Sequence, residues 1–548
     1  MSDATPEKLN KPKKERPEKQ VYPASRFVHE FPLRVPGPQR RKLGNMFHFG
    51  VNLFNAIMGE TRNVAVALRE STPWQETLGL KKSAERNLLF SELMKSARLD
   101  KMSMEEIART HRLKCAIKDH LDDHLCQTIA ARVCDALHSY LFYKKGLPRF
   151  KAWNMYDSIE GKTNTQSIRW RGGVVKYGKL AFAPIFDRKD VVEAHALNCI
   201  GSDDGGAAYC RFVRRRISGS TQYFVQVVIK GSPATKQKHL EAREANKGQI
   251  VGLDVNLAIV AASGATEARL DLLCPDTAVR QKKIAKIQRY IDRATRVTNP
   301  RLFTAKGKPK KGSKGKFVYS KSCKQARAHL ADEHRRVASS RKTEHGELTN
   351  KLLVLGDRFK TEAISYKGWQ KLYGKTSAAR APGSLEVLLT RKAENAGGCV
   401  ERTPLHLALS QKCVCGARFK KKLWQRWHNC PECGIRIQRD LMSAYLAANV
   451  NVAKKSLDVP MAQSRWAAAE GLLVDAASRA IQEANVRISR QQWVPASLGV
   501  STGDRAFRVK GTIGTTTKIH LGGDNRDSQA QGRLVKRSPY QPERTPSL

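Results

Sequence analysis

Residues 249–262 have the sequence QIVGLDVNLAIVAA, and this stretch decides the class of fold. It is apolar up to Asp254, and a second apolar run follows at Leu257–Ala262. Two short apolar runs separated by a polar turn are typical of buried strands. A carboxylate at the end of a buried strand is costly unless it meets a cation. The stretch therefore predicts two core strands, with Asp254 as a candidate functional residue.

Two more acidic residues stand out further along the chain. Glu362 lies in a short predicted strand, 358–364, and Asp440 begins an apolar helix. Each of the three has a structural alternative: Asp254 closes a turn with Asn256, Glu362 is a solvated strand residue, and Asp440 is a helix N-cap. Together, two strand-borne carboxylates and one at a helix start are what a pair of divalent ions needs for in-line phosphodiester hydrolysis. Carboxylates are also the ligands that Mg²⁺ prefers.

Four of the 12 cysteines cluster in two pairs, and each pair is followed by glycine. Fourteen residues, 416–429, separate the pairs. Paired thiolates on tight turns predict a tetrahedral zinc site. The first pair has only one intervening residue, so unliganded thiols remain an alternative, and His428 is an alternative fourth ligand. The predicted zinc ligands are Cys413, Cys415, Cys430 and Cys433.

The chain is strongly basic: 99 Lys and Arg against 50 Asp and Glu give a net charge of +49 over 548 residues. Such a charge excess is unsuited to an enzyme of small metabolites and predicts a nucleic-acid partner. The length predicts about three or four domains. No stretch is apolar enough for a membrane span or a signal peptide, so we expect a cytoplasmic protein with reduced cysteines and no membrane partner.

The N-terminal half alternates between strand and helix patterns. A predicted strand at 27–33 precedes helical sequence from Arg40 to Gly146, and strands return at 167–177. A basic hairpin follows at 209–229 and turns at Ser218–Ser220. If the first strand shares this sheet, a helical domain is inserted into a small β-barrel. A polar linker is expected at 232–247.

The remaining segments are helical or irregular. Helices are predicted at 279–297, 321–353 and 461–488. Between the first two lies the Gly/Lys-rich stretch Lys306–Lys316, which we interpret as a mobile loop that contacts phosphates. The composition of 501–548 is typical of disorder.

These motifs resemble a known family. Gly252-Leu253-Asp254, Glu362, the cysteine pairs and Arg439-Asp440-Leu441-x-x-Ala444 are similar to the split RuvC-like nuclease of TnpB transposon proteins and their descendants, the compact type V CRISPR effectors. The order of the motifs also matches, including Ser410-Gln411-x-Cys413 at the entry to the cysteine region. The resemblance is strong over about 248–450, looser over 140–247 and absent at the C-terminus.

The resemblance implies a multidomain α+β protein. An RNase H-like (RuvC) α/β nuclease domain with an inserted zinc ribbon accompanies a small wedge β-barrel with an inserted helical recognition domain. The implied boundaries are a disordered basic arm at 1–22, wedge parts at 23–40 and 147–247, and the recognition domain at 41–146. The nuclease occupies 248–410, with a basic helical insert at 278–353, and 435–455. The ribbon lies at 411–434, a helical extension at 456–500 and a disordered tail at 501–548.

The resemblance also implies an RNA-guided DNA endonuclease in a prokaryotic cytoplasm. Asp254, Glu362 and Asp440 hold two Mg²⁺ or Mn²⁺ ions, with Asp254 bridging both. The partners are a guide RNA, crRNA-like and either alone or with a second scaffold RNA, and double-stranded target DNA beside a short flanking motif. Base pairing then supplies the sequence recognition. Whether the protein is a monomer or a homodimer is left open.

Basic and aromatic residues are candidates for nucleic-acid contacts, because cations neutralise phosphates and aromatic rings stack on bases. For the aromatic residues, core packing is the structural alternative. Trp369 is the preferred stacking residue, since it closely follows Glu362. The candidates are Arg149, Lys151, Trp170, Arg211, Arg214, Arg216, Lys306, Lys308, Lys310, Lys311, Lys314, Lys316, Trp369 and Arg439.

Three other functions remain open. One is a guide-directed DNA-binding effector that silences its target with little or no double-strand cleavage. Another is a transposon-encoded TnpB-type nuclease that uses an element-derived RNA. The third, a guide-free structure-specific nuclease, leaves the helical and barrel domains unexplained. The presence of all three carboxylates favours cleavage over DNA binding alone.

Overall fold

The computed structural model describes residues 26–495 and Leu498, except for 144, 188, 311–314 and 423. The expected arm at 1–22, the expected tail at 501–548, Lys311 and Lys314 all lie outside the described residues. One hydrophobic core gathers side chains from residues 31–229, and two more gather side chains from residue 251 onward. Among the described residues, no helix is long and apolar enough to cross a membrane.

The first core lies on a seven-stranded sheet in which neighbouring strands are antiparallel and follow the order β2-β6-β7-β1-β5-β4-β3. The predicted strand at 27–33 lies in the middle of this sheet, so its shared membership is confirmed. The predicted hairpin is confirmed as β6 and β7, while closure into a barrel stays a prediction. The strands are β1 (Arg26–Arg34), β2 (Ser158–Glu160), β3 (Arg169–Arg171), β4 (Val174–Tyr177), β5 (Leu180–Pro184), β6 (Ala207–Ile217) and β7 (Ser220–Lys230).

Among the described residues, five α-helices lie between β1 and β2, as the helical pattern predicts. The side chains of Ser83, Asp100 and Asp122 accept backbone amide hydrogens at the starts of the third, fourth and fifth of them. Such N-caps fix where a helix begins. The helices are α1 (Gly37–Glu70), α2 (Thr72–Gly79), α3 (Ala84–Ser96), α4 (Lys101–Lys114) and α5 (Asp123–Phe142).

Two further helices follow in the chain, α6 (Val191–Ile200) and α7 (Gln237–Ala245). The second lies inside the stretch expected to be a polar linker, and none of its residues is buried. The side chain of Asn246, at the C-terminal end of α7, donates to the Val354 carbonyl oxygen over 2.9 Å. A helix without a buried apolar stripe is thus held by polar contacts that a hydrophobic pattern does not show.

A second sheet of five strands follows the order β10-β9-β8-β11-β12. Strands β8, β9 and β10 are antiparallel, whereas β8, β11 and β12 run parallel. The carboxyl ends of β8 and β11 therefore meet at one edge of the sheet. The strands are β8 (Ile250–Val255), β9 (Ile259–Ser263), β10 (Ala268–Leu272), β11 (Arg358–Glu362) and β12 (Cys399–Thr403).

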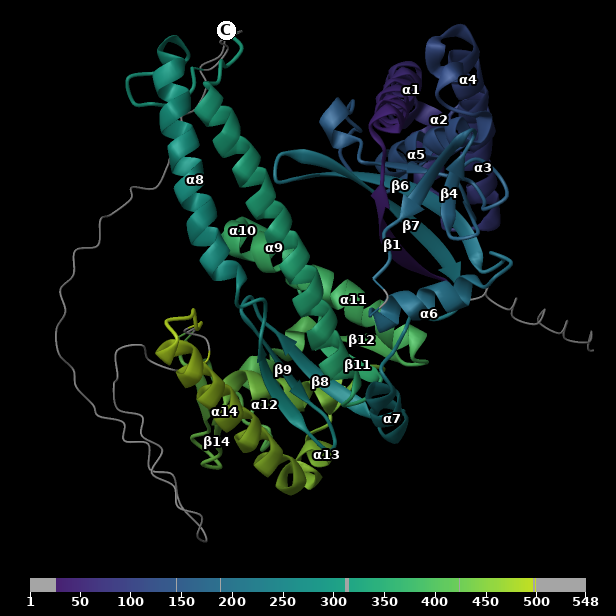
Figure 1. Cartoon of the computed structure of the whole chain (residues 1–548). Coiled ribbons are helices and arrows are strands. Elements are labelled where there is room, and N and C mark those ends of the chain that lie inside the picture. The colour runs from purple at the N-terminus through teal and green to yellow at the C-terminus, as the bar shows by residue number, and fades with distance from the viewer. Residues whose placement is uncertain are drawn as a thin grey trace, which may run out of the picture. The chain divides into compact units, whose positions relative to one another are not determined.

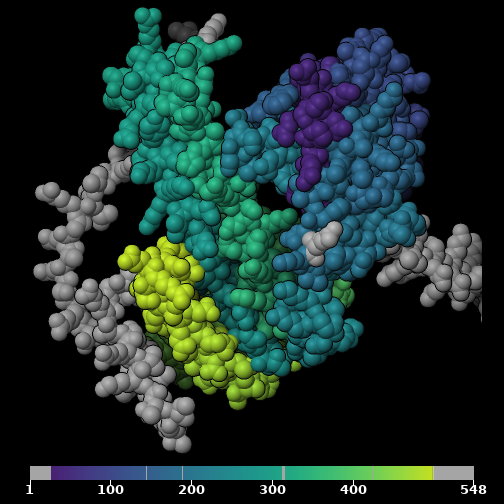
Figure 2. All heavy atoms as spheres, viewed as in Figure 1, coloured from purple at the N-terminus to yellow at the C-terminus, as the bar shows by residue number. Residues whose placement is uncertain are grey.

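Helices and two small hairpins complete this part. One face of α14 packs on β10 through Leu473 and alanines, and its other face lies on the surface (Figures 1 and 2). The helices are α8 (Thr277–Thr298), α9 (Lys321–Leu353), α10 (Tyr366–Arg380), α11 (Pro382–Asn395), α12 (Arg439–Ala448), α13 (Val459–Ser464) and α14 (Trp466–Ser489). The hairpins pair β13 (Trp427–Asn429) with β14 (Arg436–Gln438) and β15 (Val450–Asn451) with β16 (Ser456–Leu457).

Candidate active site and metal centre

The structure brings the three predicted carboxylates together. Asp254 lies near the end of β8, Glu362 ends β11, and Asp440 lies in the first turn of α12. Burial raises the pKa of Asp254 well above its usual value, and the charges of Asp440 and Glu362 raise it further. The three side chains are therefore close enough for each charge to oppose ionisation of Asp254.

Two amide side chains hold the carboxylates, and neither was among the predicted site residues. Asn256 Nδ2 donates to Asp440 Oδ1 over 3.0 Å and lies 3.4 Å from Asp254 Oδ1. Gln438 Nε2 donates to Asp440 Oδ2 over 2.9 Å. The only signal in the sequence is their position, each two residues from a candidate aspartate.

The hydrogen bonds of Gln438 show which residue caps α12, and so whether Asp440 is the N-cap. Its Oε1 accepts the backbone N–H groups of Asp440 and Leu441 over 2.7 and 2.8 Å. Gln438 is thus the N-cap of α12, and the N-cap alternative for Asp440 is wrong. The Asp440 carboxylate, which is 3% exposed, receives the side-chain amides instead.

Helix α12 lies directly against β8 at Gly252. An ideal Cβ atom at this position would lie 1.9 Å from the Ala444 carbonyl oxygen and 2.4 Å from the Ala448 nitrogen. Lys360 on β11 binds the C-terminal end of α12. Its Nζ donates to the carbonyl oxygens of Ala448 and Val450 over 3.3 and 2.7 Å. The absence of a side chain at Gly252 therefore permits the approach that brings Asp440 to Asp254.

The carboxylate site suits cations. Burial raises the pKa of Asp440 and of Glu362 as well as that of Asp254. The positive charge of Arg439 partly offsets the rise for all three residues. Binding of one ion by all three carboxylates would favour oxygen atoms within 4.8 Å of one another. The three carboxylates do not meet this condition. Buried carboxylates that repel one another are the donor set that divalent cations stabilise.

The four predicted cysteine ligands do form such a cluster, with all sulfur atoms within 4.8 Å of one another. The Sγ atoms of Cys413 and Cys433 lie 3.5 Å apart, and those of Cys415 and Cys430 lie 3.6 Å apart. Tetrahedral zinc with Zn–S bonds of about 2.3 Å places sulfur atoms about 3.8 Å apart. The single-residue gap of the first pair is therefore compatible with one ion bound by all four thiols.

Glycines shape the two turns that carry these thiols. Gly416 and Gly434 have φ angles of +95° and +73°, where side chains are disfavoured. Their N–H groups donate to the carbonyl oxygens of Cys413 and Cys430, each over 3.1 Å. Burial raises the pKa of the Cys430 thiol, but amide hydrogen bonds outweigh it and bring the pKa to about 7. Burial raises the pKa of Cys413 and of Cys433, so Cys430 is the thiol that most readily becomes a thiolate, the form that binds metal.

His428 is not part of this cluster. Its side chain is fully buried and its Nδ1 contacts Lys421 Nζ. Burial, with the nearby Lys421 charge, lowers the pKa of His428 to about 4. The imidazole is therefore a neutral core group beside the ribbon.

Two predicted nucleic-acid contacts are wrong because their side chains are buried. Trp170 is 1% exposed, and its ring centroid lies 5.1 Å from that of Phe31 in the first core. Arg214 is 4% exposed. Arg211 is half-buried, and its Nε donates to Glu160 Oε2 over 2.8 Å. These residues stabilise the sheet rather than offering free groups to a nucleic acid.

Other predicted contact residues lie at the surface. Trp369 is half-buried in the first turn of α10, with its ring edge-on to Tyr366 at 5.8 Å. Lys151 is half-buried, with Nζ 4.1 Å from the Phe54 ring centroid. Arg439 is half-buried beside the carboxylates. The exposed residues are Arg149, Arg216, Lys306, Lys308, Lys310 and Lys316.

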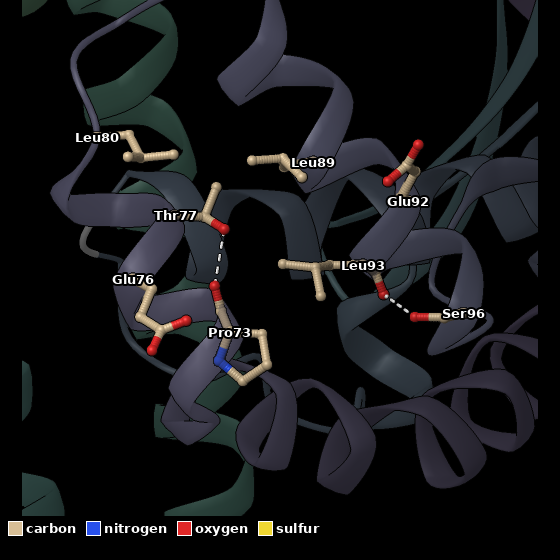
Figure 3. Close-up of a pocket in the computed structure, with 8 residues that line it drawn as sticks. All are labelled: Pro73, Glu76, Thr77, Leu80, Leu89, Glu92, Leu93 and Ser96. Atoms are coloured by element: carbon tan, nitrogen blue, oxygen red, sulfur yellow. Dashed lines mark hydrogen bonds between the residues drawn. The ribbon is translucent and has the colours of Figure 1, made fainter.

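A groove of about 500 Å³ between α2 and α3 shows no catalytic constellation. Figure 3 shows leucines on its walls and the hydroxyl groups of Thr77 and Ser96 bonded to backbone carbonyl oxygens of their own helices. These two hydroxyl groups are thus already satisfied. The carboxylates and cysteines, by contrast, belong to the second part of the chain.

Comparison with known proteins identifies one segment. Residues 383–446 match the family described as Cas12f1-like, TNB domain, and this segment contains all four cysteines and Asp440. No curated protein matches the chain.

Two solved structures are similar over most of the chain. A Cas12f1–sgRNA–target DNA complex is 11% identical with a TM-score of 0.41 and covers 78% of this chain and 99% of its own. A CRISPR–Cas12f ternary complex is 11% identical with a TM-score of 0.28 and covers 76% and 82%. The chain therefore contains a Cas12f1-like TNB domain at residues 383–446, and over that segment its resemblance to compact type V CRISPR effectors is confirmed.

Proposed function

We propose that the protein is an RNA-guided DNA endonuclease that hydrolyses phosphodiester bonds at Asp254, Glu362 and Asp440. The observation that carries the proposal is the meeting of these carboxylates at one edge of the second sheet, with Asn256 joining two of them. Carboxylates held in this way are the ligands of a two-ion nuclease.

The order of the second sheet supports an RNase H-like nuclease fold. Three antiparallel strands followed by two parallel strands place Asp254 on the central strand and Glu362 on its parallel neighbour. The first sheet supports the proposed wedge, since α1 to α5 interrupt it between β1 and β2. We further propose that its strands form the small β-barrel.

The proposed ions fit these residues. Two Mg²⁺ or Mn²⁺ ions would supply charge stabilisation of the scissile phosphate and an activated water. Asn256 and Gln438 orient the Asp440 carboxylate, and Gly252 lets α12 bring it to Asp254. Cys413, Cys415, Cys430 and Cys433 would hold Zn²⁺ in a structural role, because four thiols leave no open position.

A guide RNA and double-stranded DNA are the proposed partners. The net charge of +49 calls for a large polyanion, and the Cas12f1-like domain carries Asp440 of the proposed site. Phosphate contacts from Lys306, Lys308, Lys310 and Lys316 and from Arg149, Arg216 and Arg439 would position the nucleic acid, while base pairing supplies the sequence.

The test begins with sequencing the RNA that co-purifies with the full chain. We expect a repeat–spacer RNA, whereas an element-end RNA would identify a TnpB-type nuclease. With that RNA, Mg²⁺ and a matching duplex, we expect cleavage that EDTA stops. Asp254→Ala and Asp440→Ala should abolish cleavage but retain binding.

Other outcomes are equally informative. Full cutting by both variants would overturn the site. Binding without cleavage by the unchanged protein would favour the silencing effector. Affinity should fall steeply with salt, because phosphate contacts release counterions, and a flat dependence would contradict them.

A further inference from the structure

The segment between α5 and β2 exposes large apolar side chains in basic surroundings. Phe150 is 53% exposed and Trp153 is 50% exposed. Arg149 beside them is also exposed. Exposed aromatic residues are costly in water unless a partner covers them, and the positive neighbour indicates what kind of partner. Neither ring was among the predicted contacts.

A buried guanidinium supports the indole of Trp153. The Arg214 Cζ atom lies 3.8 Å from the centroid of this ring, and Arg214 Nη2 donates to the Trp153 carbonyl oxygen. Because Arg214 is 4% exposed and lies on β6, the ring rests on a fixed part of the sheet. The indole of Trp153 is thus already ordered, so binding a partner on its exposed part would cost little further side-chain entropy.

The backbone leading to these rings is also fixed. Lys151 N donates to Asn55 Oδ1 over 2.8 Å, and Asn55 Nδ2 returns a bond to the Lys151 carbonyl oxygen over 2.9 Å. Arg62 Nε donates to the Pro148 carbonyl oxygen over 3.1 Å, and its Cζ lies 5.9 Å from the Phe150 ring centroid. Helix α1 therefore holds the segment in place from the other side.

The charges around the segment are mainly positive. Arg62, Arg149 and Lys151 accompany the two rings, and the acidic group near Arg214 is Asp157, 4.0 Å away. A cationic surface with flat aromatic rings suits nucleic acids, since every base offers a ring face for stacking and every phosphate a negative charge. An apolar protein partner would gain nothing from the cations.

We propose that Trp153, with Phe150 beside it in the chain, is a stacking platform for an unpaired nucleobase. This inference rests on the proposed function, because it assumes that the protein binds nucleic acid. The base comes either from RNA or from a displaced DNA strand, and both offer the same chemistry.

The test compares strands that differ only in their bases. The full-length protein is titrated with fluorescent oligo(dT), with oligo(U), and with an abasic deoxyribose-phosphate strand of equal length. Trp153→Ala should weaken oligo(dT) or oligo(U) binding about 5- to 150-fold, the range of one lost base stack, and leave the abasic strand unchanged. The strand that loses affinity identifies the source of the base.

Two further variants separate stacking from folding. Trp153→Tyr retains a ring and should retain most of the affinity. Met155→Ala removes a 68% exposed apolar side chain two residues away and should change nothing. Equal losses on the abasic strand, or unchanged affinity of Trp153→Ala for all strands, would overturn the platform. If the unchanged protein binds none of the strands, the proposed function itself fails.

Discussion

Asn256 and Asp440 lie 184 positions apart in the chain, and a hydrogen bond of 3.0 Å joins their side chains. The bond ties the turn after β8 to the first turn of α12. Asn256 also lies 3.4 Å from Asp254, so one amide contacts both aspartates. The two aspartates thus share a neutral residue that orients their carboxylates.

Asn256→Ala should therefore lower cleavage while sparing nucleic-acid binding. Residues that orient metal ligands typically contribute 10- to 100-fold, and we expect a loss of about that size. Cleavage rates measured across a Mg²⁺ titration check this, and raised Mg²⁺ should recover part of the rate. An unchanged rate at every Mg²⁺ concentration would show that Asn256 does not support the site.

Asp254→Asn and Asp440→Asn should abolish cleavage yet stabilise the metal-free protein at neutral pH. The folded-state pKa of each aspartate lies above its usual value, mainly because of burial. The folded state then binds these protons more tightly than the unfolded state, so stability falls as pH rises from about 4 through the raised pKa. The asparagine side chain does not ionise, so the variants do not lose this stability as the pH rises.

Thermal unfolding in EDTA checks the prediction. We expect each variant to unfold roughly 2 to 4 °C higher at pH 8, the shift that about 1 kcal/mol produces in a domain of 150–250 residues. The gain should vanish below about pH 3, where the carboxyl group is protonated in both the folded and the unfolded state. Added Mg²⁺ should raise the unfolding temperature of the unchanged protein more than that of either variant. A lower unfolding temperature of both variants at pH 8 would contradict the raised pKa.

Gly252→Ala should destabilise the second part of the chain and reduce cleavage. The new methyl group would meet the backbone of α12, which cannot yield as a flexible side chain does. Such overpacking costs about 1–3 kcal/mol. Denaturant unfolding and cleavage assays measure both effects.

Gly346→Ala provides the matched control. Gly346 lies within α9, and an ideal Cβ there has no neighbour within 4 Å. Alanine should therefore stabilise that helix by up to about 1 kcal/mol without loss of cleavage. If the two variants behave alike, close approach is not the function of Gly252.

Cys430→Ser should release zinc and lower both stability and cleavage. Loss of one ligand weakens the turn-borne site, and the ribbon leads through β14 directly into Gln438 and Asp440. Elemental analysis and thermal unfolding measure the two effects. Cys115→Ser, at an exposed cysteine outside the cluster, should change neither. Full zinc content in Cys430→Ser would contradict the four-thiol site.

Local patterns predicted the elements that carry the site. The helix predicted at 321–353 coincides with α9, and the strands predicted before Asp254 and around Glu362 are present. Apolar periodicity and cysteine spacing act over short stretches, so they can be read along the chain. The three carboxylates were found because acidic residues are rare in apolar elements.

The burial and partners of several residues could not be predicted, because they depend on contacts between residues far apart in the sequence. Trp170 follows an arginine and precedes another, which indicated a surface, yet tertiary packing places it in the core. Arg214 likewise lies in a basic run but supports Trp153. Asn256 and Gln438 are ordinary polar residues until β8 and α12 meet. Pairing and burial of this kind are not encoded in a local pattern.

The contact between Gly252 and α12 can form only after both segments have been synthesised. With 184 positions between Asn256 and Asp440, a ribosome adding about 5–20 residues per second makes the later residue roughly 10 to 40 seconds after the earlier one. Until α12 emerges, β8 lacks its covering helix and Asp254 has no Asp440 beside it. Under the proposed function, a polypeptide still attached to its messenger RNA would lack the complete carboxylate site until residue 440 is made.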